Sequence, residues 1–222
     1  ALLCTGTEVV EPGEEPAGGQ IFNANGPMLG ALMRPACRSF EYLGTVGDDR
    51  EELLARVQRG LDSDVLVITG GVSMGQYDLV PDVLEEAGVG QICHKVAIKP
   101  GKPTYFGRTE RTLVFGMPGN PQSCFVIFKM IVEPALAAMG GLRASLPRFE
   151  TGRSAEGFPN KPARMNVMPC RIDQDDGGVL IRRQPYHGSA DIVGPAEADG
   201  YFVVPRGTEY VREGQTLRFF RI

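Results

Sequence analysis

The chain has 222 residues, of which 42% are hydrophobic and 23% charged, enough for an apolar core in one large domain or two smaller ones. Its net charge of -4 argues against a nucleic-acid partner, because nucleic-acid binders usually present a basic face. Five cysteines without a CxxC pair and two histidines predict neither a disulfide framework nor a histidine-rich metal site. No apolar run approaches the roughly 20 residues of a membrane span and no signal peptide is recognisable, so we expect a cytoplasmic chain without a membrane partner.

The first part of the chain alternates predicted strands and helices. It opens on ALLCTG, which reads as a strand already under way, as a fragment of a longer protein or a separate domain would. Such alternation predicts an α/β fold with a doubly wound, mainly parallel sheet. We expect strands at 1–4, 40–46, 64–69, 92–99, 104–107 and 112–116, and helices at 25–34, 48–59, 79–87 and 122–139.

The pattern changes after the glycine pair at 140–141. Short runs such as ARMNVMPCRI, GVLIRRQPY, YFVVPRG and QTLRFFRI follow, separated by turn clusters, and no convincing helix is predicted. This is typical of a small all-β domain of sandwich or barrel type. We therefore predict an α/β domain at residues 1–143 and a small all-β domain at residues 144–222.

Three loops are predicted at the carboxyl ends of strands, where open α/β sheets bind their ligands. They read CTGTE at 4–8, TGGVSMGQYD at 69–78 and GMPGNPQS at 116–123. The glycines of the second loop let its backbone approach a phosphate, but they equally suit a tight strand-to-helix turn. In the third loop, Asn120 and Pro121 are typical of a helix start, which either only begins the helix or also offers N–H groups to an anion.

Lysines gather in HKVAIKPGKP, residues 94–103. Lys95 and Lys99 are an even number of positions apart, so they would share one face of a strand, and Lys102 follows them. Amines close to phosphate loops favour anion binding. The alternative is a solvated edge strand that uses lysine to prevent pairing.

Carboxylates also follow the predicted strands. Glu8, Asp48 and Asp78 could together hold Mg²⁺, which prefers oxygen ligands and pairs with phosphates. Taken singly, each of them is equally well explained as a helix cap or a surface charge.

Six motifs in unbroken order resemble the molybdopterin molybdenumtransferase family of the MoeA type, which is related to the E domain of gephyrin. They span about residues 1–140, and the tail from Gly188 is more loosely similar to the C-terminal barrel of that family. The resemblance therefore implies that the all-β domain at residues 144–222 is a β-barrel domain. The resemblance covers only the C-terminal half of the sequences in that family. The motifs are TGTEVVEPGE, GQIFNANGPML, GDDREEL, ITGGVSMGQYD, KVAIKPGKP and FGMPGNPQS.

The resemblance implies insertion of molybdate into adenylylated molybdopterin, with Mg²⁺ present and AMP released. It also implies a homodimer, with molybdopterin adenylyltransferases and molybdoenzymes as functional neighbours. The residues implied in catalysis are Asp48, Asp78, Lys95 and Lys99, and those implied in metal binding are Glu8, Asp48 and Asp78. The residues implied in binding the cofactor are Thr5, Gly6, Glu8, Gly70, Gly71, Ser73, Gly75, Lys102, Pro118, Gly119 and Asn120.

Departures from the family motifs leave alternatives open. Thr7 stands where the motif has an acid, and Asn23 stands where it has an aspartate. With the N-terminal half of the family not represented, a non-catalytic molybdopterin-binding or scaffold module is the first alternative. The second is a nucleotide-amide hydrolase of the competence-damage type, which should lack KPGKP and PGNP.

Overall fold

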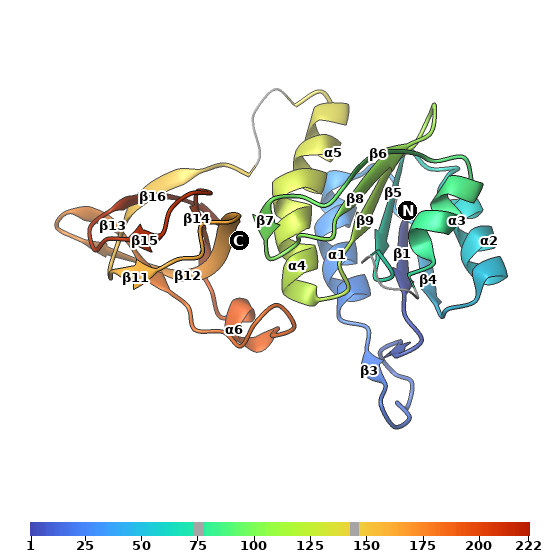
Figure 1. The fold of residues 1–222 in the computed structure, drawn as a ribbon, viewed down its shortest axis with the longest axis horizontal. Helices are drawn as coiled ribbons and strands as arrows, with labels where there is room; N and C mark the ends of the chain where they lie inside the picture. The colour runs from blue at the N-terminus through green and yellow to red at the C-terminus, as the bar shows by residue number, and fades with distance from the viewer. Residues whose placement is uncertain (73–77, 143–146) are drawn as a thin grey trace.

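The computed structural model describes residues 1–72, 78–142 and 147–222, which form an α/β domain and a β-barrel (Figure 1). The first domain is built on a six-stranded sheet with the strand order β4-β1-β5-β9-β8-β6. The first four strands in this order are parallel, whereas β8 and β6 run antiparallel to their neighbours. The strands are β1 (Leu2–Thr5), β4 (Tyr42–Val46), β5 (Val65–Thr69), β6 (Gly90–His94), β8 (Tyr105–Arg108) and β9 (Leu113–Met117).

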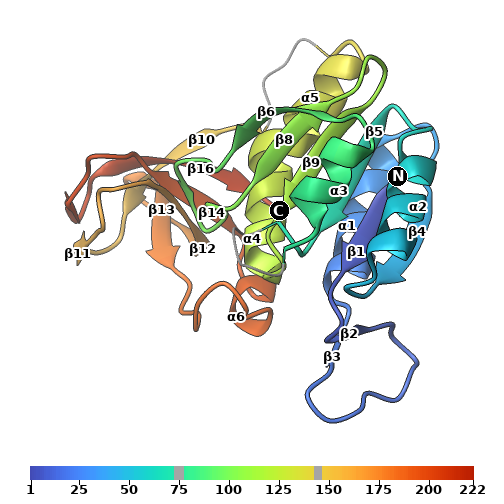
Figure 2. The same cartoon turned by 45° about the vertical axis from the view of Figure 1, so that its right-hand side comes forward.

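Helices cover both faces of this sheet, which confirms the doubly wound α/β fold (Figure 2). On one face, Leu53, Val57 and Val83 pack against the buried strands. On the other face, Leu29 and Met33 pack together with the helix that follows β9. The helices before β9 are α1 (Asn25–Met33) with a 3₁₀ turn (Arg34–Ala36), α2 (Arg50–Gly60) and α3 (Val80–Glu86).

One long helix follows β9, made of α4 (Pro121–Ile127), a π-helical turn (Phe128–Val132) and α5 (Glu133–Met139). It has 19 residues, and an 18-residue window within it has a mean hydropathy of 1.4, so by length and composition it could cross a membrane. The expectation that no apolar segment approaches that length is therefore wrong. A core helix passes the same test, and this one places Cys124, Phe128 and Val132 in the core against the sheet.

The second domain is a closed barrel, as predicted. Its strands follow the order β13-β10-β16-β14-β12, and a further pairing of β12 with β13 closes the ring. Phe202, Phe219 and Val204 fill its interior. One short helix, α6 (Val193–Ala196), interrupts a region for which no helix was expected. The strands are β10 (Glu150–Ser154), β11 (Phe158–Pro159), β12 (Met165–Asp175), β13 (Gly178–Arg183), β14 (Gly200–Val204), β15 (Tyr210–Val211) and β16 (Thr216–Arg221).

A short strand of the first domain joins the two domains. β7 (Ile98–Lys99) pairs in parallel with β12, so that Ile98 lies opposite Met165 and Lys99 opposite Asn166. The prediction of one continuous strand over 92–99 is wrong, because β6 ends at His94 and Lys95 adopts a φ of 90°. The loop that follows Lys99 consequently lies between the domains.

An arm projects from the sheet edge between β1 and α1. It consists of β2 (Val9–Val10), a connecting loop and β3 (Ile21–Phe22), and the two strands form a parallel pair. Figure 2 shows this loop extending away from the body of the molecule. The arm leaves and rejoins the domain beside the carboxyl ends of the parallel strands.

Candidate functional site

The three predicted loops meet at one edge of the sheet. Strands β1, β5 and β9 are adjacent and parallel, so their carboxyl ends lie side by side. The Gly70 N–H donates to the carbonyl of Met117 at 3.0 Å, and the Thr5 hydroxyl donates to the carbonyl of Thr69 at 3.4 Å. These bonds tie the three strand ends together and fix the loops that follow them.

A cavity of about 750 Å³ opens at these strand ends. Two further predicted residues, Ser73 and Gly75, lie outside the described residues. The predicted residues that line the cavity are Thr5, Gly6, Glu8, Asp48, Gly70, Gly71, Asp78, Pro118, Gly119 and Asn120. The structure therefore gathers ten separately predicted residues around one space.

Gly70 shows why this loop needs glycine. Its φ of +92° lies in the region that L side chains rarely adopt, and a Cβ there would stand 2.8 Å from the Thr5 hydroxyl oxygen. The second loop can therefore pass directly over the end of β1 only with glycine at this position. For Gly119, the nearest atom to an added Cβ is 3.7 Å away, so its role is less constrained by packing.

The three carboxylates expected to hold Mg²⁺ line the cavity without forming a cluster. Among the described residues, no group of three His, Cys, Asp or Glu side chains could hold a metal ion. Asp49 caps α2 by accepting from the Glu52 N–H at 2.9 Å, which leaves Asp48 at the cavity, where the Thr7 hydroxyl donates to it at 3.2 Å. Mg²⁺ is commonly held by one or two carboxylates together with phosphate oxygens. These side chains can therefore coordinate the ion only when a bound ligand supplies the remaining oxygen atoms.

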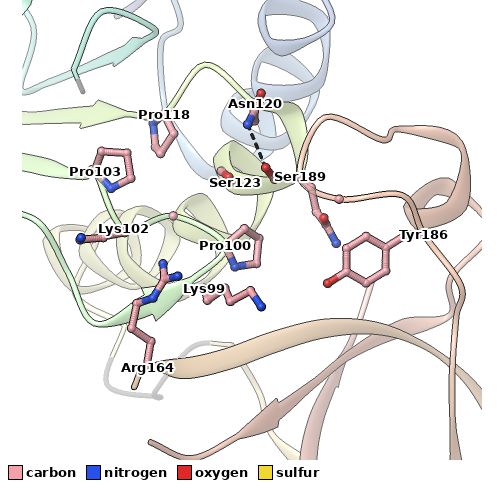
Figure 3. A pocket seen from close by; sticks show the side chains of 13 residues that line it. Lys99, Pro100, Lys102, Pro103, Pro118, Asn120, Ser123, Arg164, Tyr186 and Ser189 are labelled. Carbon is pink, nitrogen blue, oxygen red and sulfur yellow. Dashed lines mark hydrogen bonds between the residues drawn. The ribbon is translucent and has the colours of Figure 1, made fainter. Parts of the chain in front are cut away.

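A second cavity of about 490 Å³ lies between the two domains, and several of the side chains that line it are cationic (Figure 3). Lys99 and Lys102 come from the first domain and Arg164 from the barrel. In Figure 3 the Arg164 guanidinium is directed toward the loop that carries Pro100 and Lys102. Because the cations come from both domains, this cavity exists only when the domains are packed together.

The electrostatics of this cavity favour an anion. Burial, followed by repulsion from Lys161 and Arg164, lowers the pKa of the Lys99 ammonium below its ordinary value. A bound anion would relieve that repulsion. Lys95, by contrast, is exposed and lines neither this cavity nor the larger one within the described chain, because the backbone turns at its positive φ.

One barrel loop, between β13 and α6, completes the second cavity and was not predicted. The Asn120 side chain donates from Nδ2 to the Ser189 hydroxyl at 2.8 Å, and the Gln122 N–H donates to the Ser189 carbonyl at 3.2 Å. Tyr186 lies on the same side. The sequence offered one signal for this loop, since the GSA segment containing Ser189 resembles a family motif, but nothing in it placed that segment beside Asn120.

Asn25 is a second residue that sequence reasoning missed. Its Nδ2 donates to the Gly119 carbonyl at 2.6 Å and to the Thr69 hydroxyl at 2.9 Å. It thereby connects the start of α1 with the second and third loops, and it lines the larger cavity. In the GQIFNANGPML motif, the sequence pattern predicts for Asn25 only the beginning of a helix.

Comparison with known proteins identifies the family to which this chain belongs. Residues 1–138 match the family described as "Probable molybdopterin binding domain", and residues 151–220 match the "MoeA C-terminal region (domain IV)". The chain belongs to the molybdopterin molybdenumtransferase family of the MoeA type. The resemblance read from the six motifs is thereby confirmed.

Individual relatives agree with this assignment. The chain is 27% identical over 224 residues to a molybdopterin molybdenumtransferase of Bacillus subtilis, matching all of this chain and 52% of the relative. A molybdopterin biosynthesis MoeA protein from Pyrococcus horikosii is 30% identical, with a TM-score of 0.83 over 99% of this chain and 53% of that one. The chain thus spans about half the length of these relatives.

A likeness to the CinA protein from Thermoplasma acidophilum is limited to the fold. It covers 60% of this chain at 16% identity, with a TM-score of 0.50. The CinA match does not extend over the rest of this chain, whereas the MoeA relatives match both domains.

Proposed function

We propose that this chain carries the substrate-binding part of a molybdopterin molybdenumtransferase, which inserts molybdate into adenylylated molybdopterin and releases AMP. In this proposal the larger cavity binds the adenylylated pterin and the interdomain cavity binds molybdate. Membership of the family and the transferase names of the relatives support the general activity. The assignment of each substrate to a cavity is our own.

The observation that carries the proposal is that the two cavities adjoin. Pro103, Pro118 and Asn120 line both of them. A ligand with its phosphates at the strand-end loops could therefore present its other end to an anion held between the domains. Insertion of an oxyanion into a dithiolene requires such proximity, because holding reactants in contact removes much of the entropic barrier.

The cations fit an oxyanion substrate. Molybdate is a doubly charged oxyanion, and Lys99, Lys102 and Arg164 offer it charge-assisted hydrogen bonds. The N–H groups and hydroxyls at the three strand ends suit phosphate oxygens in the same way. Lys95 is proposed to attract anionic groups from the surface, since it is exposed.

Asp48 and Asp78 are proposed to support cleavage of the adenylate, together with Glu8, by holding Mg²⁺ through one or two carboxylates and the phosphates of the substrate. When bound, the ion would neutralise phosphate charge. The three carboxylates line the cavity on which the phosphates would lie, which supports this role. A cytoplasmic homodimer is part of the same proposal.

A non-catalytic molybdopterin-binding module is the second candidate. It is favoured by Thr7, which donates a hydrogen bond to Asp48 where the family motif has an acid. The nucleotide-amide hydrolase alternative has weaker support, because the matching KPGKP and PGNP segments line the cavities described above.

The deciding experiment uses adenylylated molybdopterin and measures binding and then AMP release with and without molybdate. It is performed on this chain and on a longer version that carries an N-terminal half from a relative. Molybdate-dependent AMP release by either version supports the transferase. Binding without release in both versions supports the non-catalytic module, and absence of binding in both contradicts the two candidates together.

A further inference from the structure

A polar cluster holds the base of the arm. The Glu11 carboxylate accepts three hydrogen bonds at Oε1, from Asn23 Nδ2 at 3.1 Å, from the Tyr42 hydroxyl at 2.5 Å and from the Thr45 hydroxyl. Glu11 and Asn23 stand at the two ends of the arm, whereas Tyr42 and Thr45 belong to β4. The cluster therefore fastens both ends of the arm to the edge strand of the sheet.

Asn23 connects this cluster to α1. Its side chain is only 3% exposed, its Nδ2 lies 2.8 Å from the Tyr42 hydroxyl, and its Oδ1 accepts from the Gly26 N–H at 2.8 Å. A Cβ at Gly26 would stand 2.8 Å from Asn23 Nδ2 and 2.9 Å from the Tyr42 hydroxyl. The packing around Asn23 thus tolerates no side chain at position 26, and the arm is fixed relative to α1 as well as β4.

The protonation states suit these hydrogen bonds. Burial raises the pKa of Glu11, but hydrogen bonds from Thr45, Tyr42 and Asn23 outweigh it and leave that pKa below its ordinary value. Burial and the hydrogen bond to Glu11 raise the pKa of Tyr42. At neutral pH the carboxylate is ionised and the phenol is protonated, so the donors and the acceptor match.

The arm contributes a wall to the larger cavity. Val9, Ile21, Phe22 and the buried Asn23 line it, although Ile21 and Phe22 are 59% and 52% exposed. Farther along the arm, a Cβ at Gly13 or Gly19 would have no atom within 4 Å. The side chains at the cavity mouth therefore depend on the base of the arm for their position.

We propose that Glu11 is a positioning residue for ligand binding in the larger cavity: through Asn23, Tyr42 and Thr45 it holds the arm so that Ile21 and Phe22 form the cavity mouth. The inference rests on the proposed function for the identity of the ligand. Glu11 itself is not a catalytic residue, since it does not line the cavity. Its effect passes through the arm.

The contact between Glu11 and Asn23 can be tested by exchanging the carboxylate and the amide between the two positions. Asn23→Asp places a second carboxylate 3.1 Å from Glu11 and replaces a donor with an acceptor, so the arm should loosen. Adding Glu11→Gln restores a donor and an acceptor at that contact. The hydroxyls of Tyr42 and Thr45 lie 2.8 and 3.1 Å from the atom at position 23, so they can donate to Asp there instead.

Two measurements follow on the full chain. Hydrogen exchange is read at the Ile21 and Asn23 N–H groups, which donate to the Glu8 and Val10 carbonyls at 2.7 Å each. AMP affinity is measured by calorimetry. We expect Asn23→Asp to speed exchange at these two groups and weaken AMP binding by about tenfold, and the double variant to restore both.

Two controls separate anchoring from loss of folding. Tyr42→Phe removes one donor to Glu11 and one acceptor of Asn23 Nδ2 but leaves the bonds to Glu11 from Asn23 and Thr45, so it should give a smaller change in the same direction. Glu15→Gln on the exposed part of the arm should change neither measurement. Unchanged exchange in Asn23→Asp, or faster exchange with unchanged AMP affinity, would overturn the proposal, as would a double variant no better than the single one. If AMP does not bind the original chain, the nucleotide part of the proposed function is wrong, and the exchange data alone decide whether Glu11 anchors the arm.

Discussion

Asn120 donates a hydrogen bond to the Ser189 hydroxyl at 2.8 Å, which joins the first turn of the long helix to a loop of the barrel. Asn120 also lines both cavities, so this contact lies where the proposed pterin and molybdate sites meet. The Gln122 N–H donates to the Ser189 carbonyl through the backbone. The barrel loop is thus held by one side-chain bond and one main-chain bond.

Ser189→Ala removes only the side-chain bond. We expect the free energy of unfolding to fall by no more than about 1 kcal/mol, since the group is exposed and the main-chain bond survives. Molybdate affinity, measured by calorimetry, should fall severalfold because the loop loses its fixed position. Gln174→Ala, at an exposed site on the barrel, serves as the matched control and should change neither quantity. Equal molybdate affinity in Ser189→Ala and the original chain would contradict the assignment.

Lys99→Ala should separate binding from stability. The ammonium lies close to Lys161 and Arg164, so its removal relieves repulsion and should leave thermal stability unchanged or slightly higher. Molybdate affinity should fall by about tenfold or more, because a charge-assisted hydrogen bond is lost. Arg111→Ala, at the turn before β9 and at the opposite end of that strand, removes a cation without approaching the cavity. A comparable loss of molybdate affinity in Arg111→Ala would show that this affinity depends on the net charge of the chain and not on the position of Lys99.

The lowered pKa of Lys99 predicts a pH dependence. Between this folded-state pKa and the ordinary value of 10.5, the unfolded chain binds more protons at this position than the folded chain, so this residue's contribution to stability rises with pH. Anion binding acts in the opposite direction, because it favours the charged ammonium. Molybdate affinity should therefore decrease as the pH rises through the pKa of Lys99, with proton uptake on binding. Calorimetry in two buffers of different ionisation enthalpy measures that uptake, which Lys99→Ala should abolish.

Gly70→Ala should be much more damaging than Gly119→Ala. At Gly70 the backbone φ is +92° and the new Cβ would meet the Thr5 hydroxyl, whereas at Gly119 the nearest atom is at an ordinary distance. We expect Gly70→Ala to lower the free energy of unfolding by about 2 kcal/mol or more, from backbone strain and overpacking. Gly119→Ala should stay within about 0.5 kcal/mol. Denaturant unfolding measures both, and similar losses would mean that the strain at Gly70 is not decisive.

Mg²⁺ should bind the chain appreciably only together with a phosphate ligand. The described residues offer no three-carboxylate group, so the ion needs phosphate oxygens to complete its coordination. Calorimetric titration of Mg²⁺ should show weak binding alone and tighter binding with AMP present. Asp48→Asn should remove this coupling, and Asp62→Asn, on the turn after α2, should not. Tight Mg²⁺ binding without AMP would contradict the shared site.

Most of the α/β fold could be predicted from local sequence. The buried strand Val65–Thr69 and the helix after Asn120 were recognisable because an apolar run and an Asn-Pro pair at a helix start are local patterns, although the Asn120 side chain makes no cap bond. The break in the predicted strand at 92–99 was not. Lys95 adopts a positive φ, and the residues beyond it pair with the barrel, a partner far away in sequence.

The candidate site likewise has a part that the sequence predicts and a part that depends on the tertiary structure. The sequence alone determined the strand-end loops and their glycines, since parallel strands place their carboxyl ends at one sheet edge whatever the rest of the chain does. Only the tertiary structure decided that Arg164 and Ser189 stand beside Lys99 and Asn120, and that Lys95 does not. The physical reason is that these contacts join two domains through β7 and the barrel loops, and the packing of two domains depends on surfaces that no local pattern encodes.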